Sequence, residues 1–208
     1  MDELKNIPTD ALARELATRT DLRYQDGLLA PELFHLRTEL GAIACTDAVP
    51  VRLRDGIIEG AVIRRGIGEY AGKFAIIGGV IAHGESIEQA LRRHFRTDLG
   101  VEINWLDPEG WRHPILAVQY KQFDRANGMD KDFNHETSKH AVVFTYLVTI
   151  ASETIRFGTT RYGQEATEIQ WFSTTTCPPE DEFGYDTHRT FLACLTEAEK
   201  VLNKKSPL

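Results

Sequence analysis

The chain has 208 residues, of which 42% are hydrophobic and 26% are charged. These proportions are ordinary for a soluble globular protein, and the length suits one domain with a terminal extension better than two full domains. The 31 acidic residues outnumber the 24 basic ones and give a formal net charge of −7. This charge argues against a broad nucleic-acid-binding surface, so any phosphate has to be held locally, by a metal ion or a few arginines.

The cysteines and the hydropathy pattern favour a cytoplasmic protein. Cys45, Cys177 and Cys194 are odd in number and widely spaced, unlike a secreted disulfide framework or a zinc site. Residues 1–23 contain no apolar run that resembles a signal peptide, and no segment is long and apolar enough to span a membrane. We therefore expect neither a membrane nor a nucleic acid as a partner.

We expect residues 1–26 to be a charged helical extension and residues 27–208 to be the main domain. A helix is expected to open near Pro31 and to end at Gly41. Strands are expected at residues 42–53, 57–64, 73–77, 114–123, 141–150 and 169–172, and helices at 86–99 and 187–202. This order predicts an α/β fold, an α/β/α sandwich in which helices cover a central mixed β-sheet.

The helix at residues 86–99 has the clearest local signals. Its apolar residues Ile87, Leu91 and Phe95 share one face. Ser86 and Gln89 have the spacing of a capping box, and Gly100 is placed to end the helix in a left-handed conformation.

The segment from Gly78 to Val101 carries the candidate chemistry. A strand that ends in two glycines allows a backbone carbonyl to approach a hard cation closely. The helix that follows then projects side chains toward the same side, where Glu85, Arg93 and Asp98 are the polar groups. This combination is suited to binding a diphosphate together with a metal ion.

The same segment resembles the Nudix box, with its spacing unbroken at Gly79, Glu85, Arg93, Phe95, Gly100 and Val101. Three positions depart from the box. His94 replaces the glutamate after the arginine, Thr97 replaces the first of the paired glutamates, and Asp98 replaces the second. The resemblance implies the Nudix α/β/α sandwich and a divalent metal, Mg²⁺ or Mn²⁺, but the chain lacks most of the usual glutamate ligands.

GDP-mannose mannosyl hydrolases are a Nudix branch with a similarly reduced box, and the likeness extends beyond it. Asp47, His140 and Glu165 stand at positions that match a strand aspartate, a strand-starting histidine and a metal-ligand glutamate of that branch. The resemblance implies a Mg²⁺-dependent homodimer that attacks the sugar carbon of a nucleotide sugar. Ala166 and Val80 replace that branch's catalytic histidine and the arginine after its double glycine.

The chain is also similar to an uncharacterised actinobacterial Nudix-like group, through the segments at residues 47–52, 90–100 and 140–148. That group implies no particular activity. The two resemblances together cover residues 27–200.

For the metal we expect Gly78, through its carbonyl oxygen, together with Asp98, Glu165 and Glu85. Glu168 is the alternative to Glu165, and a structural role for Glu85 is equally open, because a carboxylate in the first helical turn is favoured by the helix dipole. Magnesium keeps several waters and uses substrate phosphates as ligands, so few protein carboxylates suffice.

The remaining candidate groups are histidines and arginines. His135 or His140 is expected to act as general base, since histidine changes charge near neutral pH. Arg93 is expected to orient the loop and its carboxylates rather than to contact substrate. His94 is open to three roles: a softer ligand, a substitute base, or a partner of Asp98 one turn on.

Substrate contacts are expected from Asp47, Arg64 and Arg65, because arginine matches phosphate geometry well. Two hypotheses follow. The first is a metal-dependent hydrolase of a nucleoside-diphosphate-linked substrate, specifically a GDP-mannose-like nucleotide sugar. The second is a catalytically retired Nudix scaffold that senses a nucleotide or nucleotide sugar. The replacements His94, Thr97, Ala166 and Val80 favour it, because they stand where the related enzymes hold working groups.

Overall fold

The computed structural model describes Ala11 and residues 42–68, 70–107, 109, 113–123, 138–151, 154–159 and 163–204. The chain divides into residues 1–41 and 42–208, and the fold below is that of the second part. The expected N-terminal extension and the helix that ends at Gly41 lie outside the described residues, except for Ala11. His135 lies outside them as well.

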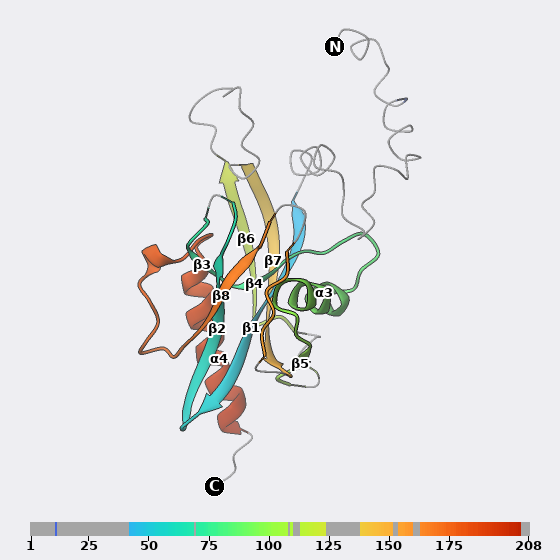
Figure 1. Ribbon diagram of the computed structural model, residues 1–208. Coiled ribbons are helices and arrows are strands. Elements are labelled where there is room, and N and C mark those ends of the chain that lie inside the picture. Colours follow the sequence, from blue (N-terminus) through green and yellow to red (C-terminus); the bar gives the residue numbers. More distant parts are fainter. Residues whose placement is uncertain are drawn as a thin grey trace. The chain divides into compact units, whose positions relative to one another are not determined.

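Eight strands form a mixed sheet within the described part of the chain (Figure 1). They are β1 (Ile43–Arg54), β2 (Ile57–Arg65), β3 (Phe74–Ala75), β4 (Ile77–Val80), β5 (Ile103–Trp105), β6 (Leu116–Phe123), β7 (Ser138–Ile150) and β8 (Ala166–Phe172). The central path runs β3-β2-β1-β7-β5, while β4 pairs with β1, β6 with β7 and β8 with β2. Strands β1 and β7 run parallel, and the other described pairings are antiparallel.

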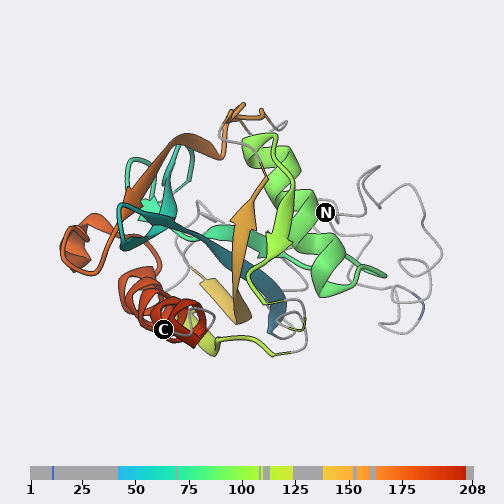
Figure 2. The ribbon, with the colours of Figure 1, turned by 90° about the horizontal axis from the view of Figure 1, so that it is seen from below.

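Two helices cover opposite faces of this sheet, α3 (Ile87–Leu99) and α4 (Thr187–Lys204), as Figure 2 shows. A short 3₁₀ helix, η4 (Glu180–Glu182), lies between β8 and α4. Each helix packs on its own apolar cluster, one including Phe95 and the other Phe191. The arrangement is the α/β/α sandwich with a mixed sheet that the sequence predicts.

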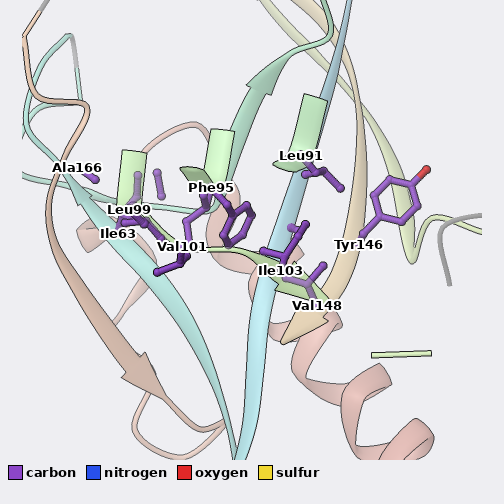
Figure 3. Close-up of a cluster of buried hydrophobic side chains, with 12 residues drawn as sticks. Ile63, Leu91, Phe95, Leu99, Val101, Ile103, Tyr146, Val148 and Ala166 are labelled. Carbon is purple, nitrogen blue, oxygen red and sulfur yellow. The ribbon is translucent and has the colours of Figure 1, made fainter. Parts of the chain in front are cut away.

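The core between α3 and the sheet is shown in Figure 3. Leu91, Phe95 and Leu99 are fully buried, because residues three or four apart share one face of a helix. They pack against Ile103 and Tyr146 of the sheet. Full burial of a side chain such as Phe95 contributes about 1.5–3 kcal/mol, so this core fixes the face of α3 that also carries Asp98.

The two ends of α3 confirm the predicted caps. Ser86 accepts a hydrogen bond from the backbone N–H of Gln89, and the Gln89 side chain accepts one from the backbone N–H of Ser86. Gly100 has φ 65°, in the left-handed region, and its N–H donates to the Arg96 carbonyl. The helix is therefore fixed at both ends by local sequence.

The capping box gives a first testable prediction. Ser86→Ala is expected to lower the free energy of unfolding by about 1 kcal/mol, because the N–H of Gln89 loses its acceptor. For a domain of this size the melting temperature should fall by roughly 2–4 °C, which thermal unfolding followed by circular dichroism can measure. Ser86→Asp restores a capping oxygen and should recover most of the loss.

The double glycine differs from its predicted position at a strand end. Gly78 and Gly79 lie inside β4, opposite Asp47 and Thr46 of β1, with φ 151° and 157°. A Cβ on Gly78 would collide with the Thr46 carbonyl oxygen, and one on Gly79 would lie 2.8 Å from Cε1 of His94. Glycine therefore serves close approach of backbone and ring here, rather than a turn.

Two further elements depart from the sequence prediction. Strand β5 has only three residues, too few to show alternation, and it forms by pairing with β7. Strand β8 begins at Ala166, three residues earlier than expected. The prediction missed this start because Thr167 and Glu168 are polar and exposed, and so interrupt the apolar pattern of the strand. No helix among the described residues combines the length and apolar character needed to cross a membrane.

Candidate functional site

Asp98 is a buried carboxylate in the last turn of α3, with 7% of its surface exposed. Burial and the negative charge of Glu165 raise the pKa of Asp98 from 3.8 to about 7, against the opposing charges of Arg93 and Arg65. Its backbone carbonyl accepts from the N–H of Gly158, so the turn is held in place. Within the described residues the Asp98 side chain has no hydrogen-bonding partner. A carboxylate in that environment is destabilised by its charge.

Glu165 approaches this carboxylate from the segment that leads into β8. Its backbone carbonyl accepts a 2.9 Å hydrogen bond from Gly66 N, which ties the segment to the end of β2. Its side chain lies 3.6 Å from Nη2 of Arg65, at the edge of ion-pair distance. The structure therefore brings Asp98, Glu165 and Arg65 together from three separate elements.

Arg93 and Glu85 form the closest ion pair of the site. Nε and Nη2 of Arg93 donate to the two carboxylate oxygens of Glu85 at 2.6 and 2.7 Å, and Nη2 also donates to the Val80 carbonyl. Glu85 further accepts from the N–H of Ala82. The hydrogen bond from Arg93 is the main reason that the pKa of Glu85 lies below its usual value. Through these contacts Arg93 ties the loop between β4 and α3 to the helix, and the role assigned to it from the sequence stays a prediction.

His94 packs on β4 rather than on Asp98. Its ring covers Gly79, and Nε2 lies 3.2 Å from the Val80 carbonyl oxygen. Burial, followed by the charge of Arg93, lowers the pKa of His94 to about 4. The neutral imidazole is therefore the form present near neutral pH, and the ring fills the space that Gly79 leaves open.

Arg64 and Asp47 lie on the α4 face of the sheet, away from Asp98. The guanidinium of Arg64 stacks on Phe74, donates to the Gly72 carbonyl at 2.6 Å and pairs with Glu168 at 3.1 Å. The charge of Asp47 raises the pKa of Cys194 in α4, which places that carboxylate near α4. Neighbouring Arg65 lies instead beside Glu165, and its charge acts on Asp98 of α3.

For two further residues predicted from the sequence, His140 and Gly78, the structure gives only the backbone pairing. His140 occupies β7, where its backbone pairs with Lys121 of β6. Gly78 pairs with Asp47 in the ladder between β4 and β1. The roles assigned to these residues from the sequence remain predictions.

The donor set fits a divalent cation held by few protein ligands. The described residues contain no group of three or more acidic, histidine or cysteine side chains arranged to hold a metal. Asp98 and Glu165 nevertheless provide two carboxylates. The charge of Glu165 disfavours ionisation of Asp98, and a bound cation would offset this repulsion. Magnesium accepts such a set, because waters and substrate phosphates complete its coordination.

Solved structures that are similar to this chain include Nudix proteins. A MutT Nudix hydrolase from Burkholderia pseudomallei is 23% identical, with a TM-score of 0.51 over 73% of this chain and 96% of that one. A possible asymmetric diadenosine tetraphosphate hydrolase from Jonesia denitrificans is 22% identical, with a TM-score of 0.55 over 78% and 98%. The Nudix domain of NrtR from Shewanella oneidensis, solved with ADP ribose, is 15% identical, with a TM-score of 0.50 over 76% and 88%. The chain has the Nudix fold.

Within that fold the chain belongs to the family described as Domain of unknown function (DUF4916), which matches residues 26–188. No curated protein matches the chain significantly. The family covers α3, Glu165 and the segment up to the start of α4, so the candidate site lies inside it.

Proposed function

We propose that the chain is a divalent-metal-dependent hydrolase of a nucleoside-diphosphate-linked substrate, with a GDP-mannose-like nucleotide sugar as the specific candidate. The observation that supports this most is the buried Asp98 beside Glu165, on the face of the sheet that α3 covers. Two carboxylates that raise each other's energy have no evident structural benefit. They suit a site for Mg²⁺ or Mn²⁺.

Asp98 and Glu165 would hold the cation, together with the carbonyl oxygen of Gly78. Glu85 contributes indirectly, because both of its oxygens accept hydrogen bonds from Arg93. When bound, the cation supplies charge stabilisation for the departing nucleoside diphosphate. Of the two arginines at the end of β2, Arg65 is the one near the carboxylates and is assigned to the substrate diphosphate.

The protein's own acid–base group is His140 or His135, which would accept a proton from the attacking water. Attack at the anomeric carbon would release free sugar and nucleoside diphosphate, whereas attack at phosphorus would release monophosphates. The nucleotide-sugar assignment rests on the sequence resemblance to mannosyl hydrolases. A homodimer and a cytoplasmic location belong to the same proposal.

A retired Nudix scaffold that binds a nucleotide without turnover is the second candidate. The ion pair between Glu85 and Arg93 and the contact between Glu165 and Arg65 favour it, because both carboxylates already have cationic neighbours. Asp98 forms no ion pair among the described residues, although the charges of Arg93 and Arg65 act on it. It distinguishes the two candidates, because a binding scaffold has no use for its charge.

The test is a release assay with nucleotide sugars and nucleoside triphosphates, run with Mg²⁺ or Mn²⁺ in ¹⁸O-labelled water. We expect metal-dependent turnover of at least one nucleotide sugar, with the label in the sugar for carbon attack or in a phosphate for phosphorus attack. Absence of turnover across the panel, together with tight binding of one of its members, would instead establish the retired scaffold.

A further inference from the structure

Arg65 is short of hydrogen bonds for a partly buried cation. Its Nε is buried without a partner, and the recorded contacts of Nη2 are long, 3.4 Å to the Ile67 carbonyl and 3.6 Å to Glu165. Arg64 next to it makes two shorter hydrogen bonds, from Nη1 to the Gly72 carbonyl at 2.6 Å and from Nε to Glu168 at 3.1 Å. A buried N–H without an acceptor costs free energy, so the position of Arg65 is not the one that stability alone would select.

A strained tyrosine lies against this guanidinium. The ring of Tyr185 is 5.1 Å from Cζ of Arg65, within the range of a cation–π contact. Tyr185 has φ 55°, and the following Asp186 has φ 56°. A left-handed conformation is uncommon for non-glycine residues and is an outlier for a bulky one, and such strain is concentrated at functional sites.

The surrounding contacts hold Tyr185 in this conformation. Gly184 on its N-terminal side donates to the Phe74 carbonyl at 2.8 Å, and the Thr187 hydroxyl donates to the Gly184 carbonyl at 2.7 Å. The Tyr70 ring packs against Tyr185 with centroids 4.4 Å apart. A Cβ on Gly184 would lie 2.7 Å from Cβ of Tyr70, so glycine is needed for this packing.

Tyr70 itself is placed by the turn that follows β2. Its carbonyl accepts from the N–H of Lys73, whose own carbonyl accepts from the N–H of Arg65. The same turn therefore fixes the backbone of Arg65 and one wall of the Tyr185 ring. Two energetically unfavourable features therefore occur at the Arg65 guanidinium, beside Glu165 and Asp98. One is the left-handed backbone of the tyrosine that contacts it, and the other is its own Nε without a partner.

We propose that Tyr185, supported by Tyr70, is a positioning residue that holds the Arg65 guanidinium ready to bind a diphosphate beside Asp98 and Glu165. This inference rests on the proposed function for the identity of the ligand. It adds the reason that Arg65 rather than Arg64 is available: the guanidinium of Arg65 has one N–H without a partner and only long contacts at Nη2, whereas Arg64 is held by two short hydrogen bonds. Arginine in a fixed plane binds a phosphate through two parallel hydrogen bonds.

The test is a double-mutant cycle on the full chain, with the affinity for inorganic diphosphate in the presence of Mg²⁺ measured by calorimetry. Arg65→Lys and Tyr185→Asn are each expected to weaken binding about tenfold. Because Tyr185 acts through Arg65, Tyr185→Asn should change affinity less than twofold when Arg65 is already lysine. Tyr185→Phe keeps the ring and should bind like the wild type.

Two further measurements separate positioning from a structural role. Tyr185→Asn should melt no lower than the wild type, because asparagine tolerates the left-handed conformation better than tyrosine does. Arg52→Lys is the matched control, since Arg52 stacks on Trp171 at the other end of the β2–β8 pairing, and it should leave affinity unchanged.

Additive effects of the two substitutions would overturn the proposal, as would a wild type that fails to bind inorganic diphosphate. The proposed hydrolase can fail separately. If diphosphate binds with the expected non-additive effects but no turnover occurs, the positioning role of Tyr185 stands and the hydrolase proposal fails. If turnover occurs but Tyr185→Asn does not change it, the hydrolase proposal stands and the positioning role fails.

Discussion

Asp98→Asn is expected to stabilise the metal-free protein at pH 8 and to leave its stability unchanged at pH 4. The pKa of Asp98 is about 7 in the folded chain against an ordinary 3.8. Between these values the folded state keeps a proton that the unfolded state has lost, so the free energy of unfolding falls as pH rises and reaches its full loss above pH 7. The difference corresponds to up to about 4 kcal/mol. Asparagine does not titrate and avoids this loss.

Thermal or urea unfolding in a chelating buffer from pH 4 to pH 8 measures this difference. Glu168→Gln is the matched control, an exposed carboxylate on β8 whose pKa is lowered by hydrogen bonds from Gln170 and Arg64. It should give no gain at pH 8. Parallel pH profiles for wild type and Asp98→Asn would show that Asp98 ionises freely and would remove the main support for the metal site.

The affinity for Mn²⁺ is expected to rise about 100-fold between pH 5 and pH 8 and to level off above pH 7. The cation binds the ionised form of Asp98, so below pH 7 a proton competes with it for that carboxylate. Burial and the charge of Glu165 place this competition near neutral pH rather than near pH 4. Paramagnetic resonance of free Mn²⁺ measures the affinity directly.

Glu165→Gln provides a second arm for this titration. It removes the charge that repels the Asp98 carboxylate, so the midpoint of the pH dependence should move to lower pH. The plateau affinity should also fall, because one proposed ligand has lost its charge. An affinity that is independent of pH across this range would exclude Asp98 as the titrating ligand.

The fold was predictable where its signals are local. The Ser86 capping box, the Gly100 cap and the apolar face of α3 lie within one stretch of 15 residues, and the structure confirms them. The strands expected at residues 42–53 and 57–64 pair as β1 and β2 across a short local turn. Strand β5 depends on pairing with β7, far along the chain, and no local sequence pattern predicts it.

Of the candidate site, only the part on α3, the helix that carries the Nudix-box spacing, was predictable from the sequence. The unbroken spacing of the box gave Asp98 a place on the inner side of α3. Which arginine lies beside Asp98 and Glu165 could not be read from the sequence, because Arg64 and Arg65 are adjacent and differ only in the face of β2 on which they lie. That face is set by the pairing of β2 with β8, a non-local interaction, with an irregularity between these two residues.

Tyr185 was missed for a different reason. Left-handed backbone is normally signalled by glycine, asparagine or aspartate, and a tyrosine gives no such signal. The conformation is imposed by contacts from Phe74 and Tyr70, which lie more than 100 residues earlier in the chain. Strain of this kind becomes visible only in the folded chain, and here it points to Arg65 as the residue being positioned.

The rate of Mg²⁺-dependent hydrolysis of nucleotide sugars, compared between wild type and Asp98→Asn at pH 8, tests the central claim most directly. Without metal at pH 8 the variant should be at least as stable as the wild type, and a melting curve in the assay buffer checks that it remains folded when Mg²⁺ is added. We expect turnover by the wild type and a loss of at least 100-fold in Asp98→Asn, consistent with removal of a charged metal ligand. Turnover that survives the substitution would contradict the assignment of Asp98 as a metal ligand in catalysis.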